Sequence, residues 1–262
     1  MKAMAAALIF FTRLPLWRFK AFNLPAEYFK QVVSYWALVG WLTAGVMAAV
    51  LWLSAQVLPF HVAVILSIVS RVLLTGALHE DGLADFFDGF GGGATKERTL
   101  EIMKDSHIGT YGVLGLILYF LLLYQLLVHL PMPFAVYAIF AADPLCKLVS
   151  SFITLVLPYA RTAETSKSKI VYGRTSIAAL VVSLIAGLAP LCFLLNYRFL
   201  LAALFPITMF ALLTFVIKRR LQGYTGDCCG AMFLLTELSF YLGILTITYI
   251  WSITYTAALF PL

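Results

Sequence analysis

Three aspartates near residue 85 are spaced so that a helix would bring their carboxylates together. Asp81, Asp85 and Asp88 follow an i, i+4, i+7 pattern, which places all three on one helical face. Like charges at this spacing repel one another, and a divalent cation with oxygen ligands removes the repulsion. Magnesium suits such a site best, because it keeps several waters and bridges one or two protein carboxylates to substrate phosphates. The pattern predicts a magnesium site for a phosphorylated substrate.

Glycines beside the aspartates clear space for a ligand. Gly82 and Gly89 lack side chains next to the acidic face, and three more glycines follow at 91–93. They let a bulky ligand or another backbone segment approach closely. The helix that carries the aspartates is expected to end at this glycine cluster, and Thr95 is expected to cap a short helix over 96–103. The chain is otherwise poor in charge, so a cluster of carboxylates and glycines is better explained by a binding site than by a solvated helix end.

Other polar side chains flank the aspartates. Lys104 and Ser106 can donate hydrogen bonds to phosphate oxygens. Glu80 points about 100° away from the aspartate face, so it is either a solvated residue or a supporting metal ligand. His79 and His107 are either polar anchors at the membrane interface or contacts to the substrate. The sequence leaves these alternatives open.

Two further polar segments complement this region. Arg161 opens a basic loop and can bind phosphate, although such a loop also anchors a membrane protein. Asp227 begins the last apolar run and is expected to close the metal site. Glu237 lies almost three turns deeper on nearly the same face, where an unpaired carboxylate is costly, so it is functional or paired. Asp143 and Lys147 are spaced i, i+4 and most simply form an intramembrane ion pair.

The elements that position these residues must be membrane helices. Of the 262 residues, 63% are hydrophobic and 11% are charged, whereas in a soluble domain about half are apolar and about a quarter are charged. The composition excludes a disordered chain, and the four cysteines form no spaced disulfide framework. The net charge of +6 indicates no nucleic-acid partner, because the basic residues lie between apolar runs. We therefore expect an all-α, polytopic bundle in a lipid bilayer.

We predict one integral membrane domain over 1–262 with seven spans. These are the apolar runs 34–57, 62–79, 110–130, 134–157, 176–195, 199–217 and 228–257. The remaining parts are an N-terminal interfacial segment (1–33), retained in the mature protein, a cytoplasmic catalytic segment (79–109) and cytoplasmic loops (158–175 and 218–227) with short interfacial helices.

The basic residues predict the orientation. Of the 18 Lys and Arg, all except Arg71, Lys147 and Arg198 fall in segments that lie on one side if the N-terminus is inside. Lys and Arg of short loops stay on the cytoplasmic side. The aspartates would then face the cytoplasm.

Several segments together resemble one enzyme family. The residues 79–89 (HEDGLADFFDG) and 100–112 (LEIMKDSHIGTYG) resemble the signature of cobalamin synthase, the adenosylcobinamide-GDP ribazoletransferase family. Three shorter segments agree in the same order: 11–15 (FTRLP), 159–161 (YAR), and 225–227 (TGD) with Gly230, Ala231 and Glu237 following. The resemblance runs over the whole chain.

The resemblance implies a magnesium-dependent transferase of the cell inner membrane. Such an enzyme joins adenosylcobinamide-GDP to alpha-ribazole or its 5′-phosphate, and releases adenosylcobalamin or its phosphate and GMP. A homo-oligomer and a complex with other cobamide-assembly proteins both stay open. His107 and Lys147 depart from the family, which often carries arginine at both positions, and each keeps a donor but loses the bidentate fork.

The predicted site follows from these arguments. Asp85 and Asp88 are the candidate bases, and the metal ligands are Asp81, Asp85, Asp88, Asp227 and Glu80. The predicted substrate or phosphate contacts are Lys104, Ser106, Arg161, Gly82, Gly89 and His79, with Arg13, Asp105, His107, Lys147 and Glu237 as further candidates.

Two alternatives remain. The family distantly resembles the CDP-alcohol phosphotransferases, whose aspartates are more widely spaced, so a phospholipid-type enzyme of that class is one alternative. A small-solute transporter is the other, with Asp143, Lys147 and Glu237 lining its pathway. The clustering of polar residues at the cytoplasmic helix ends argues against transport.

Overall fold

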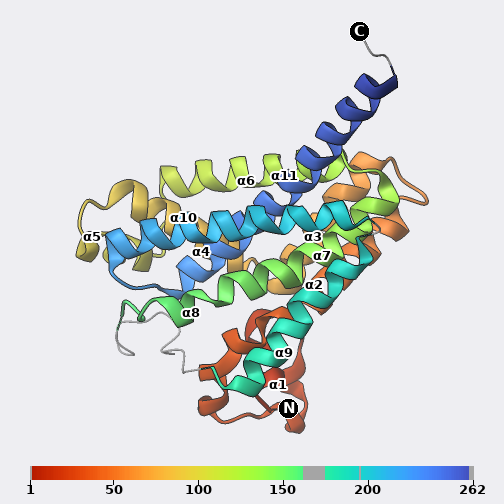
Figure 1. The fold of residues 1–262 in the computed structure, drawn as a ribbon. Helices are drawn as coiled ribbons and strands as arrows, with labels where there is room; N and C mark the ends of the chain where they lie inside the picture. Colours follow the sequence, from red (N-terminus) through yellow and green to blue (C-terminus); the bar gives the residue numbers. More distant parts are fainter. Residues whose placement is uncertain (1, 162–174, 195, 260–262) are drawn as a thin grey trace.

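The described part of the chain is helical. The structure is a computed structural model that describes residues 2–161, 175–194 and 196–259. Within these ranges no strand is present, and a single parallel β-bridge joins Tyr159 to Tyr224. The predicted all-α bundle is therefore confirmed. Figure 1 shows α1 and α9 at one end of the molecule, while the last part of α11 projects from the opposite end.

The elements follow one another through short connections. They are α1 (Lys2–Phe11), η1 (Leu16–Arg18), η2 (Lys20–Phe22), η3 (Ala26–Tyr35), α2 (Trp36–Ser54), α3 (Phe60–Thr75), α4 (Leu78–Gly92), α5 (Lys96–Lys104), α6 (Thr110–Val128), α7 (Met132–Ser151), α8 (Ile153–Val156), α9 (Ile177–Leu188), η4 (Ala189–Phe193), η5 (Tyr197–Ala203), α10 (Leu204–Leu221) and α11 (Gly226–Leu259).

Five helical stretches of the described chain are long and apolar enough to cross a membrane. They are Ala26–Ser54, Thr110–Val128, Met132–Val156, Tyr197–Leu221 and Gly226–Trp251. A sixth results if α3 and α4, which meet at 89°, count together as one broken span. These helices indicate a multi-pass membrane protein.

Among the residues that the structure describes, the predicted count of seven spans is not confirmed, for two local reasons. The run 62–79 does not continue as one helix, because Gly76 and Ala77 adopt left-handed φ values of 65° and 57° and end α3. The run 176–195 yields only the shorter apolar helix Ile177–Phe193. Two smaller predictions are confirmed: α4 ends at Gly92, and the Thr95 side chain caps α5 by accepting a hydrogen bond from the Arg98 N–H at 3.2 Å.

The turn at Gly76 directs α4 against α11, and glycines allow the two helices to approach closely. A Cβ at Gly82 would lie 3.1 Å from Cα of Asp227, and a Cβ at Gly230 would lie 3.1 Å from the carbonyl oxygen of His79. Small residues at helix contacts are typical of membrane bundles. This contact places the acidic helix α4 beside the start of α11.

Candidate functional site

One cavity collects several of the predicted site residues. It has a volume of about 280 Å³ and lies between α1, η3, α2, α4, the segment after α8 and the start of α11. Its lining residues are Phe10, Phe11, Val33, Trp36, Leu78, His79, Asp81, Gly82, Tyr159, Arg161, Thr225, Gly226, Asp227, Cys229 and Gly230. We call it the aspartate cavity.

A β-bridge assembles the polar wall of the aspartate cavity. The Tyr224 N–H donates to the carbonyl of Pro158 at 2.9 Å, and the Ala160 N–H donates to the carbonyl of Tyr224 at 2.8 Å. Burial raises the pKa of the Tyr224 phenol, which keeps it neutral. The bridge thereby fixes the segment that carries Arg161 next to the first turn of α11, which carries Asp227.

Two carboxylates from different helices line this cavity. Asp81 on α4 is exposed and Asp227 on α11 is half-buried, at the place where Gly82 lets the helices meet. Arg161 lies on the same cavity and donates from Nη2 to the carbonyl oxygen of Leu100 at 2.9 Å, which ties it to α5. The cavity therefore combines carboxylate oxygens with a guanidinium group.

This donor set fits a magnesium ion bound together with a phosphorylated substrate. Magnesium takes oxygen ligands and usually needs only one or two protein carboxylates, since water and phosphate oxygens complete its shell. Asp81 and Asp227 supply such oxygens. In the described part of the chain, no three or more His, Cys, Asp or Glu side chains gather closely enough to hold a metal ion by themselves.

Asp88 is placed differently from Asp81. Only 7% of Asp88 is exposed, and its Oδ2 accepts from the Gly109 N–H at 2.7 Å while Oδ1 accepts from the Gly112 N–H at 2.8 Å. A Cβ at Gly112 would lie 2.4 Å from Oδ2, so the close approach requires glycine. The Asp88 carboxylate thus caps the N-terminus of α6, where a negative charge is stabilised.

The three aspartates of the predicted metal site are not gathered in one cavity. Asp81 lines the aspartate cavity, whereas Asp88 lines a second depression of about 410 Å³ between α4, α5 and the start of α6. Asp85 lies between them on α4 and is half-buried. The helical spacing is as expected, but α6 and α11 cover different turns of α4.

The loop between α5 and α6 belongs to the second depression. Asp105 and His107 line it, and Asp105 Oδ1 accepts from the backbone N–H of His107 at 3.0 Å and lies 2.7 Å from His107 Nδ1. These hydrogen bonds, led by the one from the backbone, lower the pKa of Asp105. Lys104, the last residue of α5, and Ser106 on the loop are exposed. These loop residues lie apart from the lining of the aspartate cavity.

The remaining predicted residues near α4 have varied surroundings. Glu80 is 4% exposed, so its solvated alternative is wrong, because α6 and α11 pack around α4. Within the described ranges, neither Glu80 carboxylate oxygen has a hydrogen-bond partner. Gly89 is buried against Met103 of α5. Arg13 is exposed, its N–H donates to the carbonyl of Leu74 at 2.7 Å, and its side chain passes over Gly76.

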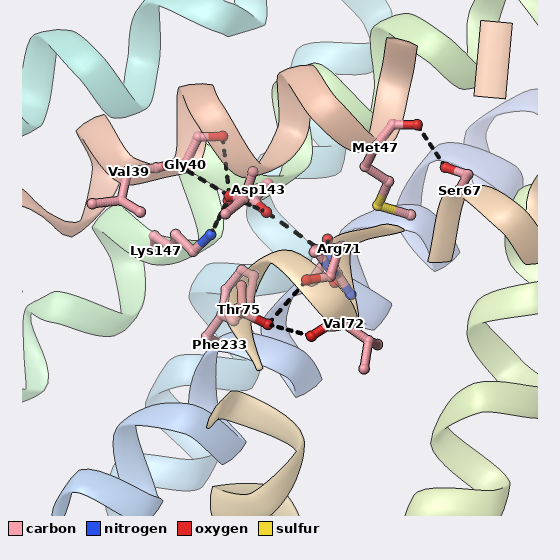
Figure 2. A network of polar contacts seen from close by, with 12 residues as sticks. Val39, Gly40, Met47, Ser67, Arg71, Val72, Thr75, Asp143, Lys147 and Phe233 are labelled. Carbon is pink, nitrogen blue, oxygen red and sulfur yellow. Dashed lines mark hydrogen bonds and ion pairs between the residues drawn. The ribbon is translucent and has the colours of Figure 1, made fainter. Parts of the chain in front are cut away.

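The predicted ion pair between Asp143 and Lys147 is confirmed. Lys147 Nζ contacts Asp143 Oδ1 on the next turn of α7, and both side chains are fully buried. Thr43 of α2 lies 2.9 Å and 3.0 Å from the two Asp143 oxygens. Figure 2 shows Lys147 and Asp143 beside the backbone of α2 and next to Phe233 of α11. Lys147 therefore joins three helices rather than the cavity.

Arg71 is a buried partner that sequence reasoning missed. Its Nη1 contacts Glu237 Oε1, and its Nη2 donates to the Tyr119 hydroxyl at 2.8 Å. Arg71 Nη1 also lies 3.9 Å from Asp143 Oδ2, which connects the two ion pairs (Figure 2). A lone arginine within an apolar run was the available signal, because a charge in the bilayer needs a partner. Glu237 is thus paired, one of its two predicted alternatives.

Sequence reasoning also missed the aromatic side of the aspartate cavity. Phe11, Trp36 and Tyr159 line it, although tryptophans and tyrosines of a membrane protein most often lie at the bilayer interfaces. Trp36 is instead 1% exposed. No local pattern distinguishes such a residue from an interfacial one.

The fold and this site define a class of protein: a multi-pass helical membrane protein with carboxylates and an arginine gathered at helix ends. The family model described as "Cobalamin-5-phosphate synthase" matches residues 3–245. The chain belongs to this family, as the sequence motifs predicted, and is an enzyme of cobalamin biosynthesis.

Curated relatives agree over nearly the full length. A protein of Shewanella baltica strain OS185 is 39% identical over 244 residues, and one of Shewanella oneidensis is 37% identical over 244 residues. Each comparison covers 92% of this chain and 92% of the relative, and both relatives are named adenosylcobinamide-GDP ribazoletransferase. No solved structure matches the chain.

Proposed function

We propose that this enzyme joins adenosylcobinamide-GDP to alpha-ribazole, or to its 5′-phosphate, and releases GMP in a magnesium-dependent reaction. The observation that carries the proposal is the aspartate cavity, which Asp81, Asp227 and Arg161 all line. Family membership and the names of the relatives support the choice of substrates. The phospholipid-type alternative would use a CDP-activated donor in the same kind of site.

The residues of the cavity divide the chemical tasks. Magnesium, held by Asp81 and Asp227, would supply charge that activates the diphosphate and stabilises the GMP leaving group. Arg161 binds phosphate oxygens and orients the diphosphate. The ribose 3′-hydroxyl of ribazole attacks the phosphorus attached to the corrinoid, and the bond to GMP breaks. Asp85, half-buried one turn from Asp81 and outside the lining of the cavity, is the candidate base that would take the proton of that hydroxyl.

The size of the cavity limits what enters it. A volume of about 280 Å³ lies just below the range for small-ligand pockets, about 300–1,000 Å³. A corrin macrocycle with its side chains is far larger than a drug-sized ligand. The corrin therefore rests at the mouth, and only the diphosphate and the acceptor reach the carboxylates.

The proposed setting is the cell inner membrane with the aspartate cavity open to the cytoplasm. The distribution of Lys and Arg along the sequence supports this orientation. A transport function has less support, because Asp143, Lys147 and Glu237 are fully buried and contact one another or Arg71.

The deciding experiment uses purified full-length protein in detergent with magnesium and each donor in turn. GMP release from adenosylcobinamide-GDP, dependent on alpha-ribazole, is expected, and CMP release from a CDP-activated lipid is not. Asp81→Asn and Asp227→Asn should each lower kcat at least about 100-fold while the protein stays folded. Glu97→Gln on α5, an exposed carboxylate away from the cavity, is the matched control. Release of CMP alone would overturn the proposal, as would near-normal turnover in both aspartate variants.

A further inference from the structure

The aspartate cavity has an aromatic wall in addition to its carboxylates. Phe11 at the end of α1, Trp36 at the start of α2 and His79 on α4 form this wall. The ring centroids of Phe11 and Trp36 are 5.1 Å apart with planes at 12°, and those of Trp36 and His79 are 5.5 Å apart at 28°. Phe10, Val33 and Leu78 extend the apolar surface. The wall suits a flat, largely apolar ligand.

Two nitrogens in this wall lack partners. Trp36 is 1% exposed and His79 is 3% exposed, and both line the cavity. Among the residues that the structure describes, neither Trp36 Nε1 nor His79 Nε2 has a hydrogen-bond partner. Buried polar groups of side chains are nearly always paired. Two buried, unpaired nitrogens on residues that line one cavity therefore favour a ligand with one or two polar atoms in a mostly apolar body.

We propose that the aromatic wall binds the dimethylbenzimidazole base of ribazole, and that the guanine of the nucleotide donor binds elsewhere. This assignment rests on the proposed function and names the substrate part that the cavity holds. Trp36 Nε1 donates to a polar atom of the nucleoside, and His79 Nε2 pairs with a second one.

The chemistry of dimethylbenzimidazole and of guanine decides which of these two bases the wall binds. Dimethylbenzimidazole is planar, carries two methyl groups and has one unsubstituted ring nitrogen, so it can pack against the aromatic wall with little polar surface to satisfy. Guanine has donors and acceptors around most of its edge. Its polar groups would be left unpaired against Phe10, Val33 and Leu78, which strongly disfavours binding.

The position of the wall agrees with this assignment. Asp81 and Gly82 follow His79 on α4, and all three line the same cavity. A nucleoside whose base lies on the wall therefore has its ribose within the cavity that Asp81 and Asp227 also line. The acceptor hydroxyl then lies next to the proposed diphosphate site.

The test measures binding of alpha-ribazole alone to the full-length protein in detergent with magnesium, by titration calorimetry. Trp36→Phe removes the indole N–H, and Phe11→Leu removes a stacking ring. Each variant should weaken ribazole binding about 2- to 12-fold, as expected for one lost hydrogen bond or one aromatic pair. Trp41→Phe is the control, because the Trp41 Nε1–H donates to the Ala186 carbonyl at 2.8 Å, away from the cavity.

Kinetics supply a second readout. In the same variants the KM for ribazole should rise by the same factor, while the KM for adenosylcobinamide-GDP stays within about twofold. Unchanged ribazole binding in both variants would overturn the assignment. So would a loss of affinity for GDP instead, or no ribazole binding by the unaltered protein. These results differ from a failure of the proposed function. In that case turnover would be absent, although ribazole would still bind at the wall.

Discussion

Replacing Asp88 with asparagine separates a structural role of this carboxylate from a catalytic one. Each Asp88 oxygen accepts one backbone N–H at the start of α6, from Gly109 and from Gly112. A hydrogen bond to a charged group contributes about 1.5–3 kcal/mol to stability. The asparagine side chain would keep one acceptor oxygen and turn an NH₂ group towards the other N–H. We expect a loss of about 2 kcal/mol, which corresponds to about 4 to 8 °C in melting temperature.

The assay compares thermal unfolding with turnover in detergent. Asp88→Asn should unfold at the lower temperature and retain catalysis when it is assayed well below that temperature. Asp81→Asn, on the exposed part of the same helix, should do the opposite, with normal unfolding and lost turnover. Glu97→Gln controls for the change of carboxylate to amide on a neighbouring exposed helix. An unchanged melting temperature together with abolished turnover in Asp88→Asn would refute the capping argument and support Asp88 as a metal ligand.

Three other changes have defined outcomes. Arg71→Leu leaves Glu237 buried without its cation and should lower the free energy of unfolding by about 3–5 kcal/mol. The double variant with Glu237→Leu should recover much of that loss. A double variant no more stable than the single one would contradict the pairing. Arg161→Lys keeps the charge but loses the planar guanidinium fork, so the KM for the nucleotide donor should rise at least about tenfold while the KM for ribazole is unchanged. An unaltered KM for the donor would exclude Arg161 from phosphate binding. Chelation should abolish turnover, and added magnesium should restore it without refolding; full activity after exhaustive chelation would rule out the metal.

Local signals predicted the parts of the fold that depend on nearby residues. The end of α4 at its glycines and the cap of α5 at Thr95 are both predicted correctly, because each depends on side chains within one turn. The break after α3 is not predicted. Gly76 lies in a run that is otherwise apolar, and Ala77, which also takes a left-handed conformation, is not a turn residue.

The contacts that place Asp81 and Asp88 in different depressions could not be predicted from the sequence. Helical spacing gives their angles on α4, but Asp88 meets Gly109 and Gly112 across a separation of more than 20 residues. The pairing of Arg71 with Glu237 spans 166 residues. Lone charges in apolar runs indicate that a partner is needed, and only the arrangement of the helices in space brings Arg71 of α3 to Glu237 of α11.

The bridge between Tyr159 and Tyr224 has a mechanical consequence. The first turn of α11 cannot tilt without pulling on the segment of Arg161, and farther along the same helix Glu237 is anchored to α3 through Arg71. Helix α11, which carries Asp227, is therefore fixed at two points along its length. The aspartate cavity is also lined by α1, which reaches the bundle mainly through apolar packing. The reacting groups are thus held by polar contacts between distant segments of the chain, whereas the N-terminal helix is held mainly by apolar contact.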